Sequence, residues 1–250
     1  MRVVMKIGGS VLTEVSQTPG WMTELHNFLE AGHNVAIVHG GGPAISVSLH
    51  KAQVPVEFYQ GQRVTTPEVL RHVVRILRGE INASLVNMLA GHGFQAVGLS
   101  GMDGSFMAAE HLPPNDLGSV GTITHVDTDF LQMFWSRAMV PVIAPLAPTE
   151  DHQEILNCNG DGVAAAVAAG IGAELLIFYT VSGGLRVSPW EGAEVVREVP
   201  RKDIEQWILS GRATKGMIPK LQAARNALER GVSGVIIGSF YGTEPATRIF

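Results

Sequence analysis

The sequence predicts an α/β fold in which a mostly parallel β-sheet carries helices on both faces. Short apolar runs alternate with helical patterns over the whole length of 250 residues, and this alternation is typical of parallel sheets. The runs are rich in β-branched residues or leucine and end near glycine, proline or a polar turn, as buried strands do. With 46% hydrophobic and 16% charged residues, the chain is long enough for one large core. We therefore expect one domain with two lobes.

Buried strands and the helices between them follow from this pattern. Pro67 and Pro219 suit the first turn of a helix, where a missing N–H costs nothing, and Asp161 is expected to cap the helix after it. The expected strands are Val3–Ile7, Val35–Val38, Ala96–Leu99, Val140–Ala144, Leu175–Tyr179 and Gly234–Ile237. The expected helices are Trp21–Ala31, Ala44–Ala52, Pro67–Leu77, Asn82–Gly91, Thr128–Arg137, Gly162–Ala169, Arg201–Leu209 and Pro219–Arg230.

Two turn-rich stretches, Asn115–Thr124 and Val187–Val199, are typical of hairpins that project from the sheet. Ligands of open α/β sheets bind outside the carboxyl ends of the strands. The segments that directly follow strands are therefore where we expect the chemistry.

Charge and cysteine content exclude several kinds of partner. The formal net charge is −5 without a cluster of Lys and Arg, so a nucleic-acid-binding surface is not expected. Cys158 is the single cysteine, which rules out an intramolecular disulfide and suits the cytoplasm. The sequence shows no signal peptide, and no run approaches the roughly 18 apolar residues of a membrane span. We expect a cytoplasmic protein that binds neither membranes nor nucleic acid.

Glycine loops follow the first two predicted strands. Lys6 precedes Gly8 and Gly9, and a cation beside bare backbone N–H groups is what a phosphate requires. The segment after the second strand contains Gly40, Gly41 and Gly42 before a helix, a second cradle for an anion. The structural alternatives are a flexible turn for the first loop and close packing for the second.

Two polar segments can recognise a small acid. Arg63, in a Gly/Thr context, can clamp a carboxylate with parallel hydrogen bonds. Asn157, Asn159 and Asp161 gather at the start of a predicted helix. Capping alone explains Asp161 but does not explain both asparagines.

A third glycine loop, Tyr179–Leu185, follows another strand, and Thr214–Lys220 brings two lysines to a helix start. Together these segments indicate phosphoryl transfer. That reaction needs two oxygens held in line and neutralised charge rather than covalent help from the protein. Lysines, Mg²⁺ and backbone N–H groups can supply both.

The motifs of other enzyme classes are absent from the sequence or stand in the wrong structural context. There is no P-loop, no Gly-x-Ser-x-Gly elbow and no Cys/His spacing for zinc. Gly91–Ala96 imitates a dinucleotide fingerprint, but it leads from a helix into a strand, the reverse of the required order.

The ordered set of motifs resembles the amino acid kinase family over essentially the whole chain, and within it the acetylglutamate kinases. The segments that carry the resemblance are Lys6–Gly9, Val38–Pro43, Gly61–Thr65, Val97–Gly104, Asn157–Asp161, Gly216–Lys220 and Thr247–Ile249.

This resemblance implies a three-layer α/β/α sandwich formed by one domain over residues 1–250. The N-terminal lobe, about residues 1–160, would hold the acyl substrate and the dimer contacts, and the C-terminal lobe, about residues 161–250, the nucleotide. It implies transfer of a phosphoryl group from ATP to the side-chain carboxylate of N-acetyl-L-glutamate. Mg²⁺ would be carried by the ATP phosphates rather than by protein side chains.

The same motifs imply roles for individual residues. Lys6 and Lys220 would stabilise the transferring phosphoryl group, and Asp161 would orient them. The implied substrate-binding residues, with Arg63 on a carboxylate, are Gly41, Gly42, Arg63, Asn157 and Asn159. The implied nucleotide-binding residues are Gly8, Gly9, Thr180, Val181, Ser182, Gly183, Gly184, Leu185 and Thr214.

The chain departs from the acetylglutamate kinase pattern in ways that keep alternatives open. Tyr179-Thr180 stands where Ser/Thr-Asp is usual, Gly160 replaces an alanine, and the usual C-terminal Gly-Thr-x-Ile is broken up. One alternative is a sister kinase that acts on aminoadipate or glutamate linked to a carrier protein; the intact glycine and Arg63 motifs favour acetylglutamate. Another is a non-catalytic nucleotide-binding regulator, against which the retention of both lysines speaks.

Arginine-inhibited members of the family carry an additional N-terminal helix that links dimers into a hexamer. Lys6 lies almost at the start of this sequence. We therefore expect a homodimer without arginine feedback.

Overall fold

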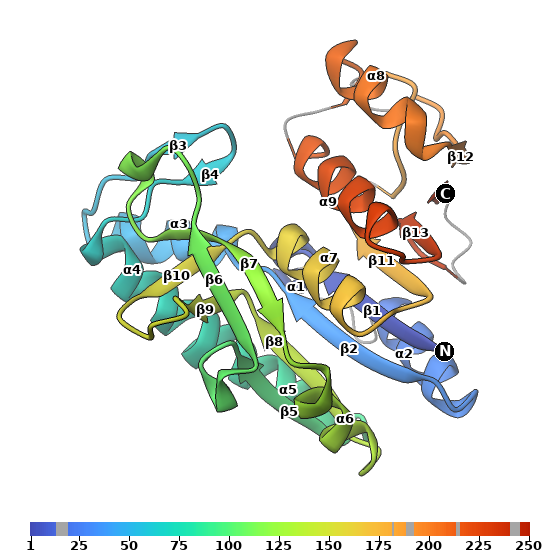
Figure 1. Cartoon of the computed structure of the whole chain (residues 1–250), viewed down its shortest axis with the longest axis horizontal. Coiled ribbons are helices and arrows are strands. Elements are labelled where there is room, and N and C mark those ends of the chain that lie inside the picture. Colours follow the sequence, from blue (N-terminus) through green and yellow to red (C-terminus); the bar gives the residue numbers. More distant parts are fainter. Residues whose placement is uncertain (14–19, 182, 189–192, 214–215, 241–245) are drawn as a thin grey trace.

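The computed structural model describes residues 1–250 except 14–19, 182, 189–192, 214–215 and 241–245. Its described residues form a central sheet of eight strands in the order β12-β14-β13-β11-β1-β2-β8-β5 (Figure 1). From β13 to β5 all neighbours are parallel, which confirms the predicted sheet. The six predicted strands are confirmed as β1 (Arg2–Ile7), β2 (Asn34–His39), β5 (Ala96–Ser100), β8 (Val140–Ala144), β11 (Leu175–Tyr179) and β13 (Gly234–Ile237). β12 (Glu198–Val199) forms one edge of the sheet and lies at the end of the second predicted hairpin stretch, whereas β14 (Thr247–Ile249), between β12 and β13, was not predicted.

Helices connect the strands and cover both faces of the sheet. The α-helices are α1 (Gly9–Thr13), α2 (Gly20–Glu30), α3 (Gly42–Lys51), α4 (Pro67–Val74), α5 (Ala83–Gly91), α6 (Thr128–Trp135), α7 (Gly160–Gly170), α8 (Ile204–Leu209) and α9 (Ile218–Glu229). Four further helical segments are η1 (Arg75–Asn82), η2 (Asp103–Ser105), η3 (Asn115–Leu117) and η4 (Arg201–Asp203). The short helix α1 was not predicted; it begins inside the first glycine loop.

The period-two alternation of β1 sorts its side chains between two cores. Val3, Met5 and Ile7 are buried in the core that includes residues of α2 and α5. Val4 lies in the core on the opposite face, with residues of α6, α7 and α9. The sheet with these two helical layers is the expected α/β/α sandwich, and Figure 1 shows α7 and α9 in front of it. Because strand residues alternate, Lys6 shares the face of Val4 and points toward α7.

The chain between residues 67 and 91 forms one continuous helical element, where two separate helices were expected. Thr66 caps α4 by accepting a hydrogen bond from the backbone N–H of Val69 at 3.3 Å. The π-helical segment η1 then continues directly into α5. The expected helices Pro67–Leu77 and Asn82–Gly91 thus lie within one element, and residues 78–81 continue the helix between them. Apolar residues of α3, α4 and η1 form a third core.

Smaller sheets stand beside the main one. β6 (Met107–His111), β7 (Val120–Val126), β10 (Ile155–Cys158) and β9 (Leu146–Pro148) form a sheet in that order, and β3 (Phe58–Tyr59) pairs with β4 (Gln62–Arg63). The first predicted hairpin is confirmed but is longer than expected, because β6 and β7 extend beyond the turn-rich stretch. In the second predicted hairpin, Arg186 pairs with Val195. Residues 189–192 of this stretch lie outside the described residues.

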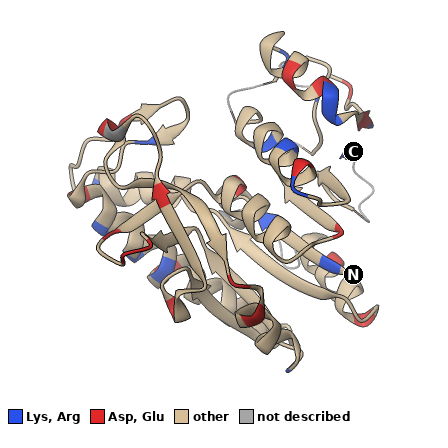
Figure 2. Cartoon of the chain, in the orientation of Figure 1, with Lys and Arg blue, Asp and Glu red and all other residues tan. Residues whose placement is uncertain are grey.

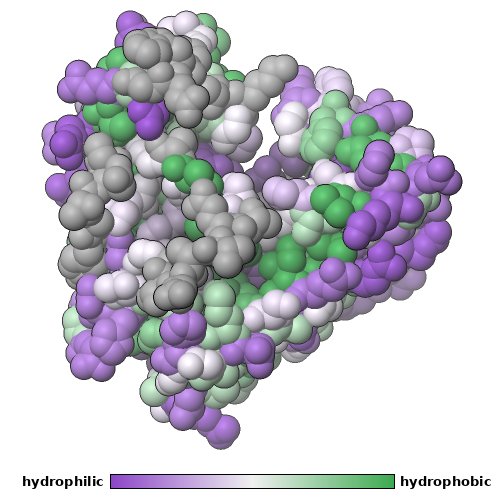
Figure 3. All heavy atoms as spheres, turned by 180° about the vertical axis from the view of Figure 1, so that it is seen from behind, coloured by the Kyte–Doolittle hydropathy of each residue, from purple (hydrophilic) through white to green (hydrophobic). Residues whose placement is uncertain are grey.

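Charged residues of both signs are interspersed over the surface elements (Figure 2). Among the described residues, no helix is long and apolar enough to cross a membrane. Seen from behind, the molecule is hollowed, and hydrophobic residues gather along one wall of the hollow (Figure 3).

Candidate active site

Three charged side chains from three elements meet beside the carboxyl end of β1. Lys6 lies near the end of β1, Asp161 in the first turn of α7, and Lys220 in the first turn of α9. Nζ of Lys6 is 2.8 Å from Oδ1 of Asp161, and Nζ of Lys220 is 3.1 Å from Oδ2. Both lysines therefore share one carboxylate, which sets the distance between their charges.

The start of α7 is fixed by a different residue than the sequence indicated. Asn159 is the N-cap, and its Oδ1 accepts hydrogen bonds from the backbone N–H groups of Asp161 at 2.9 Å and Gly162 at 3.4 Å. The expectation that Asp161 caps this helix is wrong. Its carboxylate is instead free to pair with the lysines, and its negative charge near a helix N-terminus is favourable.

Burial and charge act in opposite directions on this carboxyl group. Burial by itself raises the pKa of Asp161, but the charges and hydrogen bonds of Lys6 and Lys220 outweigh it and hold the pKa below its ordinary value. The pKa of Lys220 is lowered, chiefly by burial and also by the charge of Lys6, against the opposing effect of Asp161. Asp161 is thus ionised at neutral pH.

The lowered pKa of Lys220 predicts an alkaline limit of activity. A lysine that neutralises a phosphoryl group acts in its protonated form, so kcat/KM should fall as the pH rises through its pKa. That fall should come below the ordinary lysine value of about 10.4. In Lys220→Arg, whatever its absolute rate, this limb should disappear, because a guanidinium stays charged. ADP release measured across the alkaline range checks this, and an identical limb in both proteins would assign it to another group.

A cavity of about 210 Å³ opens next to the two lysines and Asp161. Its walls are the glycine loop after β2, the β3–β4 hairpin and the segment from β10 into α7. All five predicted substrate-binding residues line it together with Lys6, Gly9 and Asp161: Gly41, Gly42, Arg63, Asn157 and Asn159. The structure thus brings together residues that the sequence placed in four separate segments.

Arg63 is built into the wall of this cavity and keeps a donor for a ligand. The side chain is 8% exposed, and Nη2 donates to the carbonyl oxygen of Gly42 at 3.2 Å and to Ser46 at 2.8 Å. The guanidinium carbon of Arg63 lies over the Phe58 ring, 4.7 Å from the ring centroid. Nη1 is buried and has no hydrogen-bond partner among the described residues. A buried, unpaired guanidinium N–H is costly, and a substrate carboxylate would satisfy it.

The two glycine loops touch each other through their backbones. A Cβ on Gly9 would lie 3.0 Å from the backbone nitrogen of Gly41, and a Cβ on Gly40 would lie 3.0 Å from that of Gly9. A Cβ on Gly41 would meet the side chains of Leu77 and Ile81 at 2.6 and 2.5 Å. Glycine suits these positions because the two loops, and the side chains of Leu77 and Ile81, approach so closely, as the packing alternative proposed. The loops also form part of the cavity wall.

Of the predicted nucleotide-binding residues that the structure describes, Gly9 lines this cavity, whereas Gly8 and the residues from Thr180 to Leu185 do not. They lie at the ends of the neighbouring strands β1 and β11. A Cβ on Gly8 would lie 3.4 Å from the carbonyl oxygen of Tyr179, the last residue of β11. In the loop that follows, Thr180 Oγ1 donates to the carbonyl oxygen of Gly183 at 2.5 Å. Val181 is exposed, whereas Leu185 is buried. Gly184 is packed so closely that a Cβ would lie 2.6 Å from Oγ1 of Thr247. Ser182 and Thr214 lie outside the described residues.

Two supports of this loop were missed from the sequence. The backbone N–H of Leu185 donates to Oγ1 of Thr247 at 2.7 Å. The hydroxyl of Tyr179 donates to the buried carboxylate of Glu24 at 2.5 Å, and the backbone N–H of Phe240 donates to the same group at 2.9 Å. The unusual Tyr179 thus ties the strand end to α2. A buried glutamate with a distant tyrosine leaves no local pattern that sequence inspection could detect.

These groups can neutralise a phosphoryl group in transit next to a bound carboxylate, which is the chemistry of a small-molecule kinase. The chain belongs to the amino acid kinase family, whose family model matches residues 1–239. This confirms the family resemblance seen in the sequence.

Individual relatives agree with the family. The acetylglutamate kinase of Geobacillus thermodenitrificans is 42% identical over 237 residues, 95% of this chain and 89% of that protein. The acetylglutamate kinase of Bacillus subtilis is 37% identical over 246 residues, 97% and 93% of the two chains. Among solved structures, smu.665 from Streptococcus mutans matches with a TM-score of 0.89 at 29% identity, over 98% of each chain. Giardia lamblia carbamate kinase, at 14% identity and a TM-score of 0.68, shares the fold.

Proposed function

We propose that this protein transfers the γ-phosphoryl group of ATP to the side-chain carboxylate of N-acetyl-L-glutamate, a step of arginine biosynthesis. The observation that supports it most is the pairing of Lys6 and Lys220 through Asp161 beside a cavity that holds the free donor of Arg63. Relatives that are 37% to 43% identical are acetylglutamate kinases.

The reaction needs no proton transfer from the protein. A carboxylate oxygen of the substrate attacks the γ-phosphorus, the bond from that phosphorus to the bridging oxygen of ADP breaks, and an acyl phosphate and ADP result. Lys6 and Lys220 neutralise the charge on the moving group from two sides, while Asp161 keeps both in place. Arg63, Asn157 and Asn159 hold the acyl amino acid, with the Gly41–Gly42 backbone against it.

The nucleotide is proposed to lie over Gly8, Gly9 and the loop from Thr180 to Leu185, with Thr214 nearby. Both oxygens of Asp161 are engaged by lysines, and the described residues contain no group of three His, Cys, Asp or Glu that could hold an ion. We propose that the ATP phosphates carry Mg²⁺ into the site, where it would neutralise phosphate charge.

The wider organisation is part of the same proposal. Residues 1–250 form one domain, with acyl-substrate binding in about residues 1–160 and nucleotide binding in about residues 161–250. The protein acts as a homodimer in the cytoplasm. Light scattering tests the dimer, and hexamers would contradict it.

A hydroxamate assay with Mg²⁺-ATP tests reaction class and substrate together, because hydroxylamine traps an acyl phosphate. N-acetylglutamate should give a strong signal, while N-acetyl-aminoadipate, aspartate and glutamate should give little. A signal only with the longer substrate would replace this proposal by the aminoadipate kinase reading. Silence with all four would contradict it in favour of a carrier-linked substrate or a non-catalytic binder.

Arg63→Lys is expected to weaken binding of the acyl substrate. A lysine cannot reach Gly42, Ser46 and a ligand carboxylate together, because it lacks the planar fork of the guanidinium. Loss of a charged hydrogen bond is worth about 1.5–3 kcal/mol, so KM for N-acetylglutamate should rise by roughly 10- to 100-fold. KM for ATP should stay within twofold. Arg71→Lys, at an exposed position on α4, is the matched control, and an unchanged KM in Arg63→Lys would remove Arg63 from the site.

A further inference from the structure

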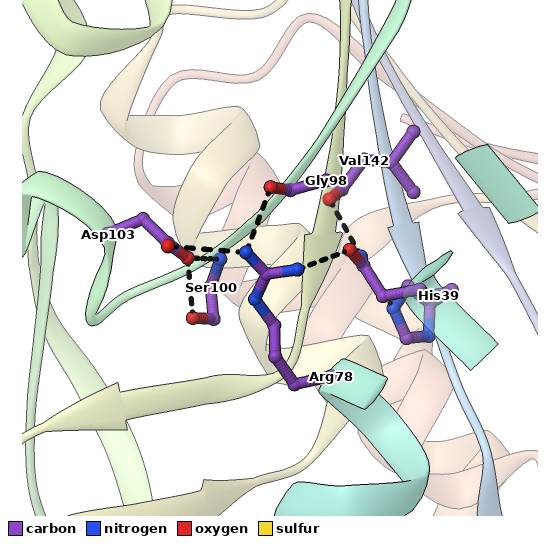
Figure 4. A network of polar contacts seen from close by, with 7 residues as sticks. His39, Arg78, Gly98, Ser100, Asp103 and Val142 are labelled. Atoms are coloured by element: carbon purple, nitrogen blue, oxygen red, sulfur yellow. Dashed lines mark hydrogen bonds and ion pairs between the residues drawn. The ribbon is translucent and has the colours of Figure 1, made fainter. Parts of the chain in front are cut away.

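A chain of polar side chains joins η1 to the glycine loop of the cavity. Figure 4 shows the part of it that runs from Asp103 through Arg78 to His39. Arg78 donates to Asp103 at 3.2 Å and to Oδ1 of Asn82 at 3.1 Å. Nδ2 of Asn82 lies 3.1 Å from Nε2 of His39, whose Nδ1 lies 3.1 Å from the carbonyl oxygen of Gly40. Asn82 and His39 are both 0% exposed, so solvent does not compete for the contact between them, whereas the side chains of Arg78 and Asp103 are 34% and 35% exposed.

The neighbours of His39 fix which of its nitrogens carries the proton. Arg78 can only donate, and the carbonyl oxygen of Val142 can only accept. Oδ1 of Asn82 therefore faces Arg78, and its Nδ2 donates to Val142 at 2.9 Å. Because an amide nitrogen only donates, Nε2 of His39 must be the acceptor. The imidazole consequently carries its proton on Nδ1 and donates it to Gly40.

The imidazole is also neutral at ordinary pH. Burial lowers the pKa of His39 to about 4, and the charges of Lys6 and Arg78 act in the same direction, against the hydrogen bond to Gly40. The residue thus supports the loop without adding another positive charge beside Lys6.

The π-helical segment η1 contacts the glycine loop in two ways, through apolar packing and through the polar contact of Asn82 with His39. Leu77 and Ile81 of η1 pack against Gly41, and Asn82 ends the same segment. Gly98 leaves the room that Asn82 occupies, since a Cβ there would collide with Oδ1 of Asn82. Eight residues of π-helix are unusual, and such segments are frequent at functional sites.

We propose that Asn82 is a positioning residue: acting through His39, it holds the Gly40–Gly42 loop in the shape that binds the acyl substrate. The orientation of this loop matters because Arg63 donates to the carbonyl oxygen of Gly42. If the Gly40–Gly42 loop rotated, the guanidinium of Arg63 would move with it, away from the substrate carboxylate. The kinetic arm of this inference depends on the proposed function.

Asn82→Asp is the sharpest variant, because it keeps the size of the side chain and the acceptor that faces Arg78. It puts an acceptor opposite both Nε2 of His39 and the carbonyl oxygen of Val142, which loses its donor. His39 must then donate from Nε2 and either releases Nδ1–H or becomes charged. We expect KM for N-acetylglutamate to rise about tenfold or more, the effect of one unsatisfied buried hydrogen bond. KM for ATP should stay within twofold.

Two variants on α5 separate positioning from stability. Asn87→Ala removes an exposed asparagine and should leave both KM values unchanged. Leu89→Ala empties a position that is 0% exposed in the core behind the sheet, so it should lower the melting temperature without raising KM for the acyl substrate. If Asn82→Asp raises that KM no more than Leu89→Ala does, Asn82 is only structural and the proposal is wrong.

The protonation state of the two imidazole nitrogens of His39 can be measured in the absence of substrate. In ¹⁵N-histidine-labelled protein, with the His39 signal assigned by its loss in His39→Gln, the wild type should show a neutral ring protonated at Nδ1. Asn82→Asp should shift it to the Nε2–H or doubly protonated form, and a wild-type ring protonated at Nε2 would overturn the proposal. Because this readout needs no turnover, a wild type that is inactive on N-acetylglutamate would contradict the proposed function and leave the test of Asn82 standing.

Discussion

Replacement of Lys220 by alanine is expected to lower kcat on the order of 10²- to 10³-fold, the loss that follows removal of one preorganised charge donor at a transition state. Lys220 lies 3.1 Å from Asp161, which lines the cavity, and the charge of the moving phosphoryl group would develop next to this pair. The affinity for ATP should change little, because the nucleotide is held mainly by the glycine loops. Single-turnover kinetics and equilibrium binding of ATP measure the two quantities separately.

Lys202→Ala is the control, since Lys202 is an exposed lysine on η4. It should leave kcat unchanged. If Lys220→Ala retains wild-type turnover, the role assigned to Lys220 is wrong. If ATP binding collapses instead, Lys220 serves the ground state rather than the transfer.

Asp161→Asn is expected to damage both rate and stability. The two lysines lose the carboxylate that separates them, and a shift of about 1 Å in a catalytic group can cost on the order of 10²-fold in rate. Removing one member of a buried ion pair costs about 3–5 kcal/mol of unfolding free energy. Urea denaturation and ADP release check the two effects.

The pH dependence gives a second readout for Asp161. Its pKa is lower in the folded protein than in the unfolded chain, where it is about 3.9. The carboxylate therefore stabilises the fold above that value, and this contribution is lost as the pH falls through the folded pKa. Asp161→Asn should lack that part of the acid destabilisation, whereas Asp129→Asn, at an exposed position on α6, should keep it. Equal acid profiles for wild type and Asp161→Asn would show that the lysines do not perturb this carboxyl.

Much of the fold could be predicted because local patterns dictate it. The apolar runs from Val3 to Ile7 and from Leu175 to Tyr179 are short and β-branched or leucine-rich, and they became neighbouring parallel strands. Two helical segments were not predicted correctly. Separate helices were expected over Pro67–Leu77 and Asn82–Gly91, where η1 joins α4 and α5 without a break, and the short helix α1 that begins at Gly9 was not predicted.

The six central strands, most of their covering helices and the residue types at the strand ends could be predicted, because periodicity and glycine content act over a few neighbouring residues. Long-range packing was needed to show that Lys6 and Lys220 share the carboxylate of Asp161 and that Asn82 reaches Gly40 through His39. It was also needed to show that Nη1 of Arg63 has no partner among the described residues. These pairings join residues far apart in the chain, and their geometry depends on how whole elements pack. Burial increases the energetic importance of each pairing, because an unpaired polar group costs more free energy in the protein interior than in water.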